Sequence, residues 1–129
     1  MIAVDASALL AILLLEPEGG RFRDILERRG GVISPVNYWE VLSRSYRAGG
    51  EAAVARAEGV IEGLGLTVGT VTLRDARSAH TAFRRFGKGV GGKLNLGDCF
   101  AYALAATEDE GLLFKGDDFA ATDVAPVAI

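Results

Sequence analysis

The amino-acid sequence predicts an α/β fold: one domain with a short parallel sheet and helices on both of its faces. Short apolar or β-branched runs of three to six residues alternate with longer stretches whose apolar residues recur at helical spacing. Strands of this length, alternating with helices, are typical of a parallel sheet that is covered on both sides. With 129 residues the chain can bury the core of one domain, which we expect to span residues 1–129.

The composition excludes several classes of protein. The longest apolar run, residues 8–15, is too short to span a bilayer, and Asp5 interrupts the region where a signal peptide would lie. The single cysteine, Cys99, excludes an internal disulfide and a multi-cysteine zinc site, so we expect a cytoplasmic protein. The net charge of −3 argues against a protein that coats nucleic acid by bulk charge, but it permits a local basic rim.

Four short strands are predicted, each followed by residues that favour a turn or the start of a helix. They are residues 2–4, 32–34, 66–71 and 112–114. Residues 124–129 are a candidate for a further short strand at the edge of the sheet.

Helices are predicted between the strands, because apolar residues recur there at the spacing of a helical face. They are residues 8–15, 21–29, 36–47, 51–64, 74–86 and 99–106, the last with Asn95 and Gly97 as residues that suit its entry. Ser7 is predicted to cap the first helix, Pro35 suits the first turn of the third, and residues 72–75 resemble a cap for the fifth. Gly49 and Gly50 separate the third helix from the fourth.

Five acidic residues lie beside apolar sequence rather than on a solvated face. Asp5 follows the first predicted strand, and Asp117 and Asp118 follow the last. Since ligand sites of parallel sheets lie outside the carboxyl ends of the strands, we expect these acids at one edge of the sheet. Glu40 lies in an apolar part of the third helix, and Asp98 directly precedes an apolar, alanine-rich run.

Several buried carboxylates without partners would cost several kcal/mol each, so they would take up protons or bind a cation. An oxygen-only set of ligands, without a His or Cys cluster, favours Mg²⁺ or Mn²⁺ over zinc. A cation of this kind activates water and polarises a phosphate oxygen. The acids therefore predict a metal site suited to phosphodiester hydrolysis.

Each acid also has a purely structural interpretation. Asp5 could cap the helix that follows it, and Glu40 could pair with Arg44 one helical turn later. The dipole of the last helix would ease the burial of Asp98. What favours a metal site is that the fold would bring all these acids together.

Four segments carry a resemblance to a known family. They are VDASAL from Val4, SPVNYWEVLSR from Ser34, LNLGDCFAYALA from Leu94 and LLFKGDDFAATDV from Leu112. In their content and order, and over almost the whole chain, they resemble the PIN-domain ribonucleases, specifically the VapC toxins of bacterial toxin–antitoxin pairs.

The resemblance implies roles for particular residues. Asp5, Glu40 and Asp98 match the family's acidic triad and would hold the metal, with Asp5 and Asp98 as the principal Mg²⁺ ligands. The fourth acid of the family matches Asp117 or Asp118, and both are carried over as catalytic, Asp117 also as a metal ligand. Ser7, Thr122 and Asp123 match positions that support the site or the fold; the first of them supports Asp5.

The resemblance also implies an activity and partners. The chain would be a Mg²⁺-dependent endoribonuclease, with Mn²⁺ as an alternative cofactor, that acts on a tRNA or on a loop of ribosomal RNA. A VapB-type antitoxin would block its site, and the toxin would form a homodimer.

Several residues outside the acidic set have a functional and a structural interpretation. Lys88 and Lys93, in the glycine-rich loop of residues 87–93, would meet RNA phosphates or simply be solvated, and Lys115 is expected close to the metal site. His80 is predicted on a helix surface and Cys99 in the core. The aromatic residues at core spacing are Trp39, Tyr46, Phe100 and Tyr102, and the alternative for Trp39 or Tyr38 is stacking on a base.

Two other functions compete with the nuclease. A phosphoacceptor domain of the receiver type also has a parallel sheet and an acidic Mg²⁺ pocket, but it needs an aspartate at the end of its third strand, and residues 66–71 contain none. The third candidate is an interaction protein with a PIN fold that has lost its activity, and the intact acids argue against it.

Overall fold

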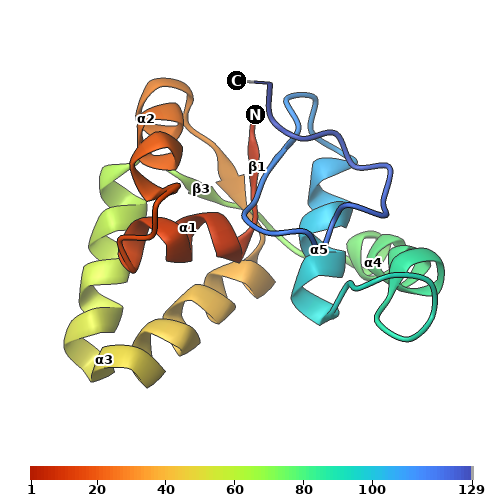
Figure 1. The fold of residues 1–129 in the computed structure, drawn as a ribbon, viewed down its shortest axis with the longest axis horizontal. Helices are drawn as coiled ribbons and strands as arrows, with labels where there is room; N and C mark the ends of the chain where they lie inside the picture. Colours follow the sequence, from red (N-terminus) through yellow and green to blue (C-terminus); the bar gives the residue numbers. More distant parts are fainter. Residues whose placement is uncertain (129) are drawn as a thin grey trace.

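A four-stranded parallel sheet forms the centre of the molecule, here a computed structural model that describes residues 1–128 (Figure 1). The strands lie in the order β3-β2-β1-β4, and every neighbouring pair is parallel. Their bounds are β1 Ala3–Val4, β2 Val32–Ile33, β3 Thr67–Val68 and β4 Leu112–Leu113. The helices are α1 Ala6–Leu13, α2 Gly19–Arg29, α3 Pro35–Gly63, α4 Leu73–Phe86 and α5 Leu96–Ala105.

Alternate strand residues point into two separate cores, so the sheet is covered on both faces. Val4 and Leu113 pack with α1, α2 and α3 on one face. Ala3 and Leu112 pack with α4 and α5 on the other face. Figure 1 shows these two groups of helices on either side of the strands. The predicted α/β fold with helices on both faces is confirmed.

The strands are shorter than predicted, and the candidate edge strand at residues 124–129 does not form among the described residues. The chain there makes one bridge, between Leu112 and Pro126, with hydrogen bonds from Leu112 N–H to Ala125 and from Val127 N–H to Leu112. Because proline has no N–H, Pro126 cannot extend the ladder. Ile129 lies outside the described residues.

The predicted start and end of the first helix are wrong by a few residues. Asp5, not Ser7, is the N-cap of α1, because Asp5 has the extended backbone that a cap needs and its carboxylate accepts the N–H of Ser7. At the other end, Leu15 has a positive φ of 55° and is 83% exposed, so the buried helix stops before it.

The two glycines that separate the predicted third and fourth helices form a kink inside α3. Gly50 has a positive φ of 70°, and Gly49 also departs from helical geometry. The part of α3 before the kink borders the pocket described below, while Ala57 and Ile61 after the kink are buried in the core.

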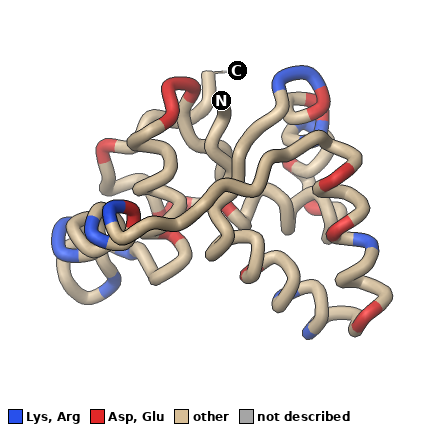
Figure 2. Tube along the Cα trace, turned by 180° about the vertical axis from the view of Figure 1, so that it is seen from behind, with Lys and Arg blue, Asp and Glu red and all other residues tan. Residues whose placement is uncertain are grey.

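The predicted cap of the fifth helix is confirmed as a capping box at the start of α4, formed by Thr72 and Asp75. His80 on α4 is exposed and Cys99 on α5 is buried, as predicted. Figure 2 shows a cluster of Lys and Arg at the left, where α4 lies. The arginines of α4 are Arg74, Arg77, Arg84 and Arg85.

Two of the aromatic residues predicted in the core lie at the surface instead. Trp39 is 67% exposed and Tyr46 is 60% exposed. Phe100 and Tyr102 are partly buried against the α4 and α5 core. Among residues 1–128, no helix combines the length and the apolar character needed to cross a membrane.

Candidate active site

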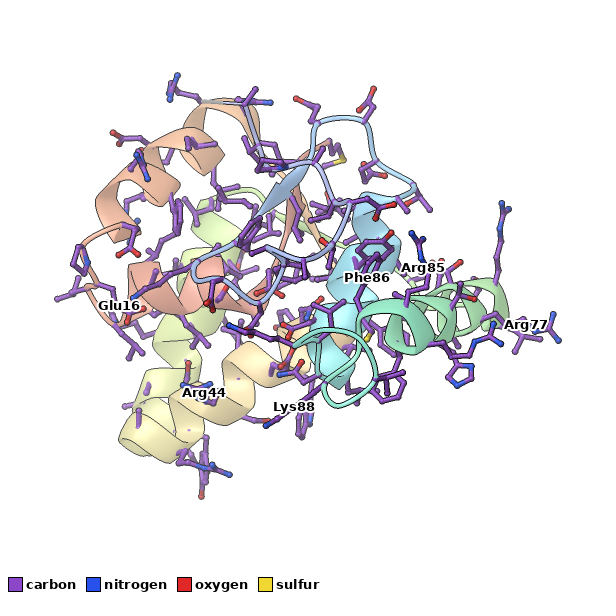
Figure 3. The ribbon with its side chains drawn as sticks, turned by 45° about the vertical axis from the view of Figure 1, so that its right-hand side comes forward. Glu16, Arg44, Arg77, Arg85, Phe86 and Lys88 are labelled. Carbon is purple, nitrogen blue, oxygen red and sulfur yellow. The ribbon has the colours of Figure 1, made fainter. Side chains whose placement is uncertain are left out.

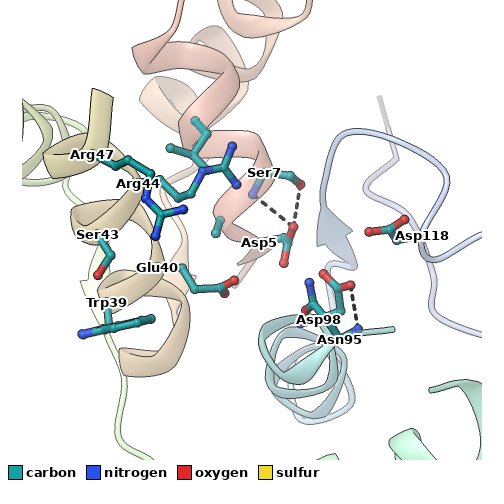
Figure 4. Close-up of a pocket in the computed structure, with 12 residues that line it drawn as sticks. Asp5, Ser7, Trp39, Glu40, Ser43, Arg44, Arg47, Asn95, Asp98 and Asp118 are labelled. Atoms are coloured by element: carbon teal, nitrogen blue, oxygen red, sulfur yellow. Dashed lines mark hydrogen bonds between the residues drawn. The ribbon is translucent and has the colours of Figure 1, made fainter. Parts of the chain in front are cut away.

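A pocket of about 290 Å³ lies at the carboxyl ends of the strands, where the sequence predicts a site. Four carboxylates line it: Asp5 directly after β1, Glu40 on α3, Asp98 on α5 and Asp118 in the loop after β4. Figure 4 shows these side chains directed from separate elements toward a common space. The fold thus brings together acids from the two ends and the middle of the chain.

Asp5 is held by the start of α1 and is 4% exposed. Ser7 donates its N–H and its hydroxyl to Asp5 Oδ2, at 3.1 and 2.5 Å. Burial raises the pKa of Asp5, and the hydrogen bonds from Ser7 act against this rise. Ser7 Oγ in turn accepts the N–H of Lys115 at 2.9 Å, which fixes the segment after β4 beside α1.

Asp98 lies in the first turn of α5 and is 8% exposed. It forms a capping box with Asn95: the N–H of Asp98 donates to Asn95 Oδ1 at 2.9 Å, and the N–H of Asn95 donates to Asp98 Oδ2 at 3.1 Å. Burial, together with the charges of Asp5, Asp118 and Glu40, raises the pKa of Asp98 to about 7. The hydrogen bond from Asn95 opposes the shift.

Glu40 is positioned by Asn37, which sits one helical turn earlier on α3 and is fully buried. The amide of Asn37 donates to Glu40 Oε1 at 2.7 Å and to the carbonyl oxygen of Gly97 at 3.0 Å. Burial raises the pKa of Glu40, and the nearby charge of Asp5 adds to this effect. Arg44 forms no ion pair with Glu40 in the described chain, although its charge lowers the pKa of Glu40 slightly.

Gly97 leaves the space that the Glu40 carboxylate occupies. A Cβ atom at position 97 would collide with both carboxylate oxygens of Glu40. Asn37 and Gly97 are therefore parts of the site that the sequence interpretation missed. The spacing of Asn37 and Glu40, three residues apart on a helix, was the signal that could have found the first of them.

The two adjacent aspartates after β4 have different surroundings. Asp118 lines the pocket, whereas Asp117 points to Lys93 and forms an ion pair with it at 2.8 Å. This pair lowers the pKa of Asp117 and raises that of Lys93. Asp117 thus lies outside the pocket, in the loop after β4, and pairs with Lys93 on the loop that joins α4 to α5.

The backbone of Lys115 lies close to the site, where it donates to Ser7, but its side chain does not line the pocket. Its ammonium group pairs with Glu16 at 2.8 Å and with Glu18 at 3.9 Å, in the connection between α1 and α2. Lys88 lies at the surface on the loop after α4, and Figure 3 labels it there. The same figure labels Glu16 at the left of the view. Neither lysine lines the acidic pocket.

The donor set of the pocket fits a divalent cation. It consists of carboxylate oxygens, which hard cations such as Mg²⁺ prefer, and the acids raise one another's pKa because their charges repel. A bound cation would remove this repulsion. Within residues 1–128, no three His, Cys, Asp or Glu side chains already have the spacing of a closed metal site.

Comparison with known proteins identifies the family to which the chain belongs. Residues 2–125 match the family model described as "PIN domain". Ribonuclease VapC42 of Mycobacterium tuberculosis is 36% identical over 126 residues, which are 95% of this chain and 96% of the relative. Ribonuclease VapC30 of the same species is 35% identical over 130 residues, with 99% of both chains covered.

A solved structure agrees with this result at the level of the fold. The crystal structure of Mycobacterium tuberculosis VapC20, described as a sarcin-ricin loop cleaving toxin, has a TM-score of 0.78 to this chain at 18% sequence identity. The alignment covers 98% of each chain. From the family model and the curated relatives together, this chain belongs to the PIN-domain family of VapC ribonucleases.

Proposed function

We propose that the chain is a Mg²⁺-dependent endoribonuclease and the toxin of a toxin–antitoxin pair, with Asp5, Glu40, Asp98 and Asp118 as its metal site. The observation that supports this most directly is the convergence of four carboxylates in one pocket, three of them with a raised pKa. Groups with perturbed pKa values gather at catalytic sites more often than elsewhere. Mn²⁺ would suit the same oxygen ligands.

The residues of the pocket have different roles in the proposed hydrolysis of a phosphodiester. Ser7 orients the Asp5 carboxylate, and the α5 capping box orients Asp98. A divalent cation bound by these acids supplies positive charge that polarises a phosphate oxygen and offsets the charge that develops in the transition state. Glu40 and Asp98 are the candidates for orienting the attacking water and accepting its proton, because burial keeps their pKa values closer to neutral.

The choice between the two aspartates after β4 follows from their surroundings. Asp118 faces the other carboxylates, and its charge raises the pKa of both Asp5 and Asp98. The charge of Asp117 is already neutralised by Lys93. We therefore propose Asp118 as the fourth acid. In the proposed set of metal ligands it takes the place of Asp117, which was expected from the sequence.

The partners follow from the family. We propose a VapB-type antitoxin as the inhibitor, a homodimer as the assembled toxin, and a structured RNA, either a tRNA or a ribosomal RNA loop, as the substrate. The cytoplasm, where these partners occur, is the proposed location. The receiver-type alternative lacks support, because β3 is followed by Gly69 and Thr70 rather than by an acceptor aspartate.

A cleavage assay tests the proposal against that of an inactive interaction protein. Purified wild-type protein is incubated with total RNA in Mg²⁺, Mn²⁺ or EDTA, beside the variants Asp5→Asn and Asp98→Asn and the control Asp24→Asn on the exposed face of α2. We expect the wild type and the control to produce RNA fragments in Mg²⁺ or Mn²⁺ but not in EDTA. The two site variants should produce no fragments. Full cleavage by either folded site variant, or fragments that persist in EDTA, would contradict the proposal.

A further inference from the structure

The acidic pocket has a second wall, which carries the opposite charge and an exposed aromatic ring. Trp39, Ser43, Arg44 and Arg47 of α3 line the pocket together with the acids. Trp39, Ser43 and Arg47 follow one another at intervals of four residues, so they share one face of the helix. Figure 4 shows this row on α3, with Glu40 and Arg44 beside it. We refer to Trp39, Arg44 and Arg47 as the α3 wall.

The arginines of the α3 wall make no direct side-chain contact with another described residue, although the charge of Arg44 acts on the pKa of Glu40. Both are exposed, and neither forms an ion pair or a side-chain hydrogen bond with any residue from 1 to 128. Other arginines do have such contacts: Arg29 pairs with Glu110, and Arg56 donates to the carbonyl oxygen of Leu13. Two unpaired guanidinium groups at the mouth of a pocket are suited to contact phosphates on either side of a reacting phosphodiester.

Trp39 is exposed in a way that packing does not explain. Its neighbour Tyr38 packs against the core of α1 and α2, whereas Trp39 turns out of the helix and remains 67% exposed. It is the one aromatic side chain among the described residues that line the pocket. A flat indole beside two phosphate-binding groups is the combination by which proteins bind unpaired nucleotides, with the ring stacked on a base.

We propose that the α3 wall is a subsite for an unpaired nucleotide next to the cleaved bond: Trp39 stacks on its base, and Arg44 and Arg47 contact the flanking phosphates. The inference rests on the proposed nuclease function and specifies its substrate. Because a base inside a duplex is already stacked on its neighbours, only a loop, a single strand or a flipped nucleotide can present its face to Trp39. The subsite therefore selects single-stranded RNA at the position of cleavage.

The composition of the chain provides a direct measurement, because Trp39 is its only tryptophan. The Asp98→Asn variant, in Mg²⁺, is titrated with a short single-stranded RNA while the tryptophan fluorescence is recorded. The comparison probe is an oligonucleotide of the same length and charge in which the bases are absent. We expect the RNA to quench the fluorescence and the abasic probe to leave it nearly unchanged, since only a base can stack.

Matched variants in the same Asp98→Asn background separate stacking from charge. We expect Trp39→Leu to weaken RNA binding by about tenfold and Trp39→Phe to restore most of it, because stacking on an aromatic ring contributes roughly 1–3 kcal/mol per base. Tyr46→Leu, on the same helix but outside the pocket, is the control and should bind as tightly as its parent. Binding is followed by the anisotropy of a labelled RNA, which does not depend on Trp39.

The arginines are tested by the salt dependence of binding. Arg44→Gln and Arg47→Gln should each reduce the slope of log affinity against log salt concentration by about 0.7, the value for one phosphate contact on a single strand. Arg77→Gln on α4 is the control, and Figure 3 shows Arg77 at the far end of the molecule from Arg44. Its slope should equal that of the parent protein.

The outcomes distinguish this inference from the proposed function. One outcome refutes the subsite and leaves the nuclease function intact. The wild type then cleaves RNA in Mg²⁺, but Asp98→Asn shows no base-dependent quenching and the added Trp39→Leu change does not weaken RNA binding. If quenching and the losses of affinity occur while the wild type never cleaves RNA, the subsite stands and the proposed function fails. Fluorescence that responds to an antitoxin but not to RNA would assign this face to a protein and overturn the inference.

Discussion

The buried amide of Asn37 connects Glu40, at 2.7 Å, to the carbonyl oxygen of Gly97, at 3.0 Å. One side chain thereby joins a carboxylate on α3 to the first turn of α5, which also carries Asp98. The two acids come from opposite faces of the sheet, and this link fixes their relative positions. Asn37 Oδ1 is buried and has no hydrogen-bond partner within residues 1–128. All hydrogen bonds of the Asn37 side chain are therefore donated by its amide nitrogen.

Asn37→Leu should reduce the rate of RNA cleavage far more than it reduces RNA binding. Without the amide, the Glu40 carboxylate loses its orientation, and a displacement of about 1 Å at a catalytic group costs on the order of 100-fold in rate. We expect a similar loss in kcat with little change in KM. Ser45→Ala, which also removes a buried polar group from α3, is the control and should retain its rate. Equal rates for Asn37→Leu and the wild type would show that Asn37 has no positioning role.

Gly97→Ala should inactivate the enzyme without unfolding it. The added methyl group would meet the end of the Glu40 side chain, which is flexible and can move aside, so the fold tolerates the change while Glu40 leaves its position. Gly59→Ala on α3, where the structure leaves open space, should keep full activity and gain stability of about 0.5–1 kcal/mol. Thermal unfolding and the cleavage rate of both variants check this prediction. If Gly97→Ala remained active, RNA cleavage would not depend on the position that the Glu40 carboxylate now has.

Asp118→Asn should lower activity by at least about tenfold, whereas Asp117→Asn should lower it by less than about threefold, a difference of roughly 0.7 kcal/mol or more in transition-state stabilisation. The reason is that Asp118 lines the pocket and Asp117 is paired with Lys93 at the surface. The two substitutions are chemically identical and adjacent, so each serves as the control for the other. The opposite order would return the fourth acid to Asp117.

The metal-free protein should lose stability as the pH rises from about 4 to 7. Asp98 has a pKa of about 7 in the folded protein against an ordinary value of 3.8, so the folded state binds more protons than the unfolded state within this window. Stability therefore falls with rising pH and levels off above pH 7, where Asp98 is ionised in both states. Burial also raises the pKa of Asp5 and Glu40, which acts in the same direction.

Asp98→Asn should then be more stable than the wild type at pH 8 in EDTA, by at least about 1.4 kcal/mol, the equivalent of one pKa unit. At pH 4 the difference should largely disappear. Denaturant unfolding at both pH values measures the effect, and Asp24→Asn is the exposed control. A constant difference between the two pH values would exclude the ionisation of Asp98 as its cause.

Mg²⁺ should stabilise the wild type and fail to stabilise Asp98→Asn. A ligand that binds only the folded state at 100 times its dissociation constant contributes about 2.7 kcal/mol. Asp117→Asn should retain this stabilisation, because its carboxylate lies outside the pocket. The shift of the unfolding midpoint on addition of Mg²⁺ is the measurement, and Na⁺ at matched ionic strength is the control for unspecific salt effects. An equal shift in Asp98→Asn would place the cation elsewhere.

Part of the fold and the site was predictable because it depends on local sequence. Asp5 directly follows β1 and Asp118 lies in the loop after β4, and the rule that parallel strands end at one edge brings them together. The choice between Asp117 and Asp118 was not predictable, because it depends on the turn at Gly116, where φ is 97°. Only the three-dimensional path of that turn decides which carboxylate faces the pocket.

The position of Trp39 shows a second limit. Helical spacing identifies residues that share a face, but it does not say whether that face meets the core or a pocket. Trp39 was predicted in the core, yet the core contact is made by Tyr38 and Val41, on another face of α3. The capping role of Asp5 illustrates a third limit, because the same carboxylate both caps α1 and lines the site.

The kink at Gly49 and Gly50 divides α3 into two parts with different surroundings. Before the kink, the helix carries Glu40 and the α3 wall; after it, Ala57 and Ile61 anchor the helix in the core. Substitutions in the exposed α3 wall leave the core intact, whereas substitutions at Val41, Ala57 or Ile61 disturb it. If the proposed subsite binds RNA, a change of substrate preference can therefore be confined to the exposed α3 wall.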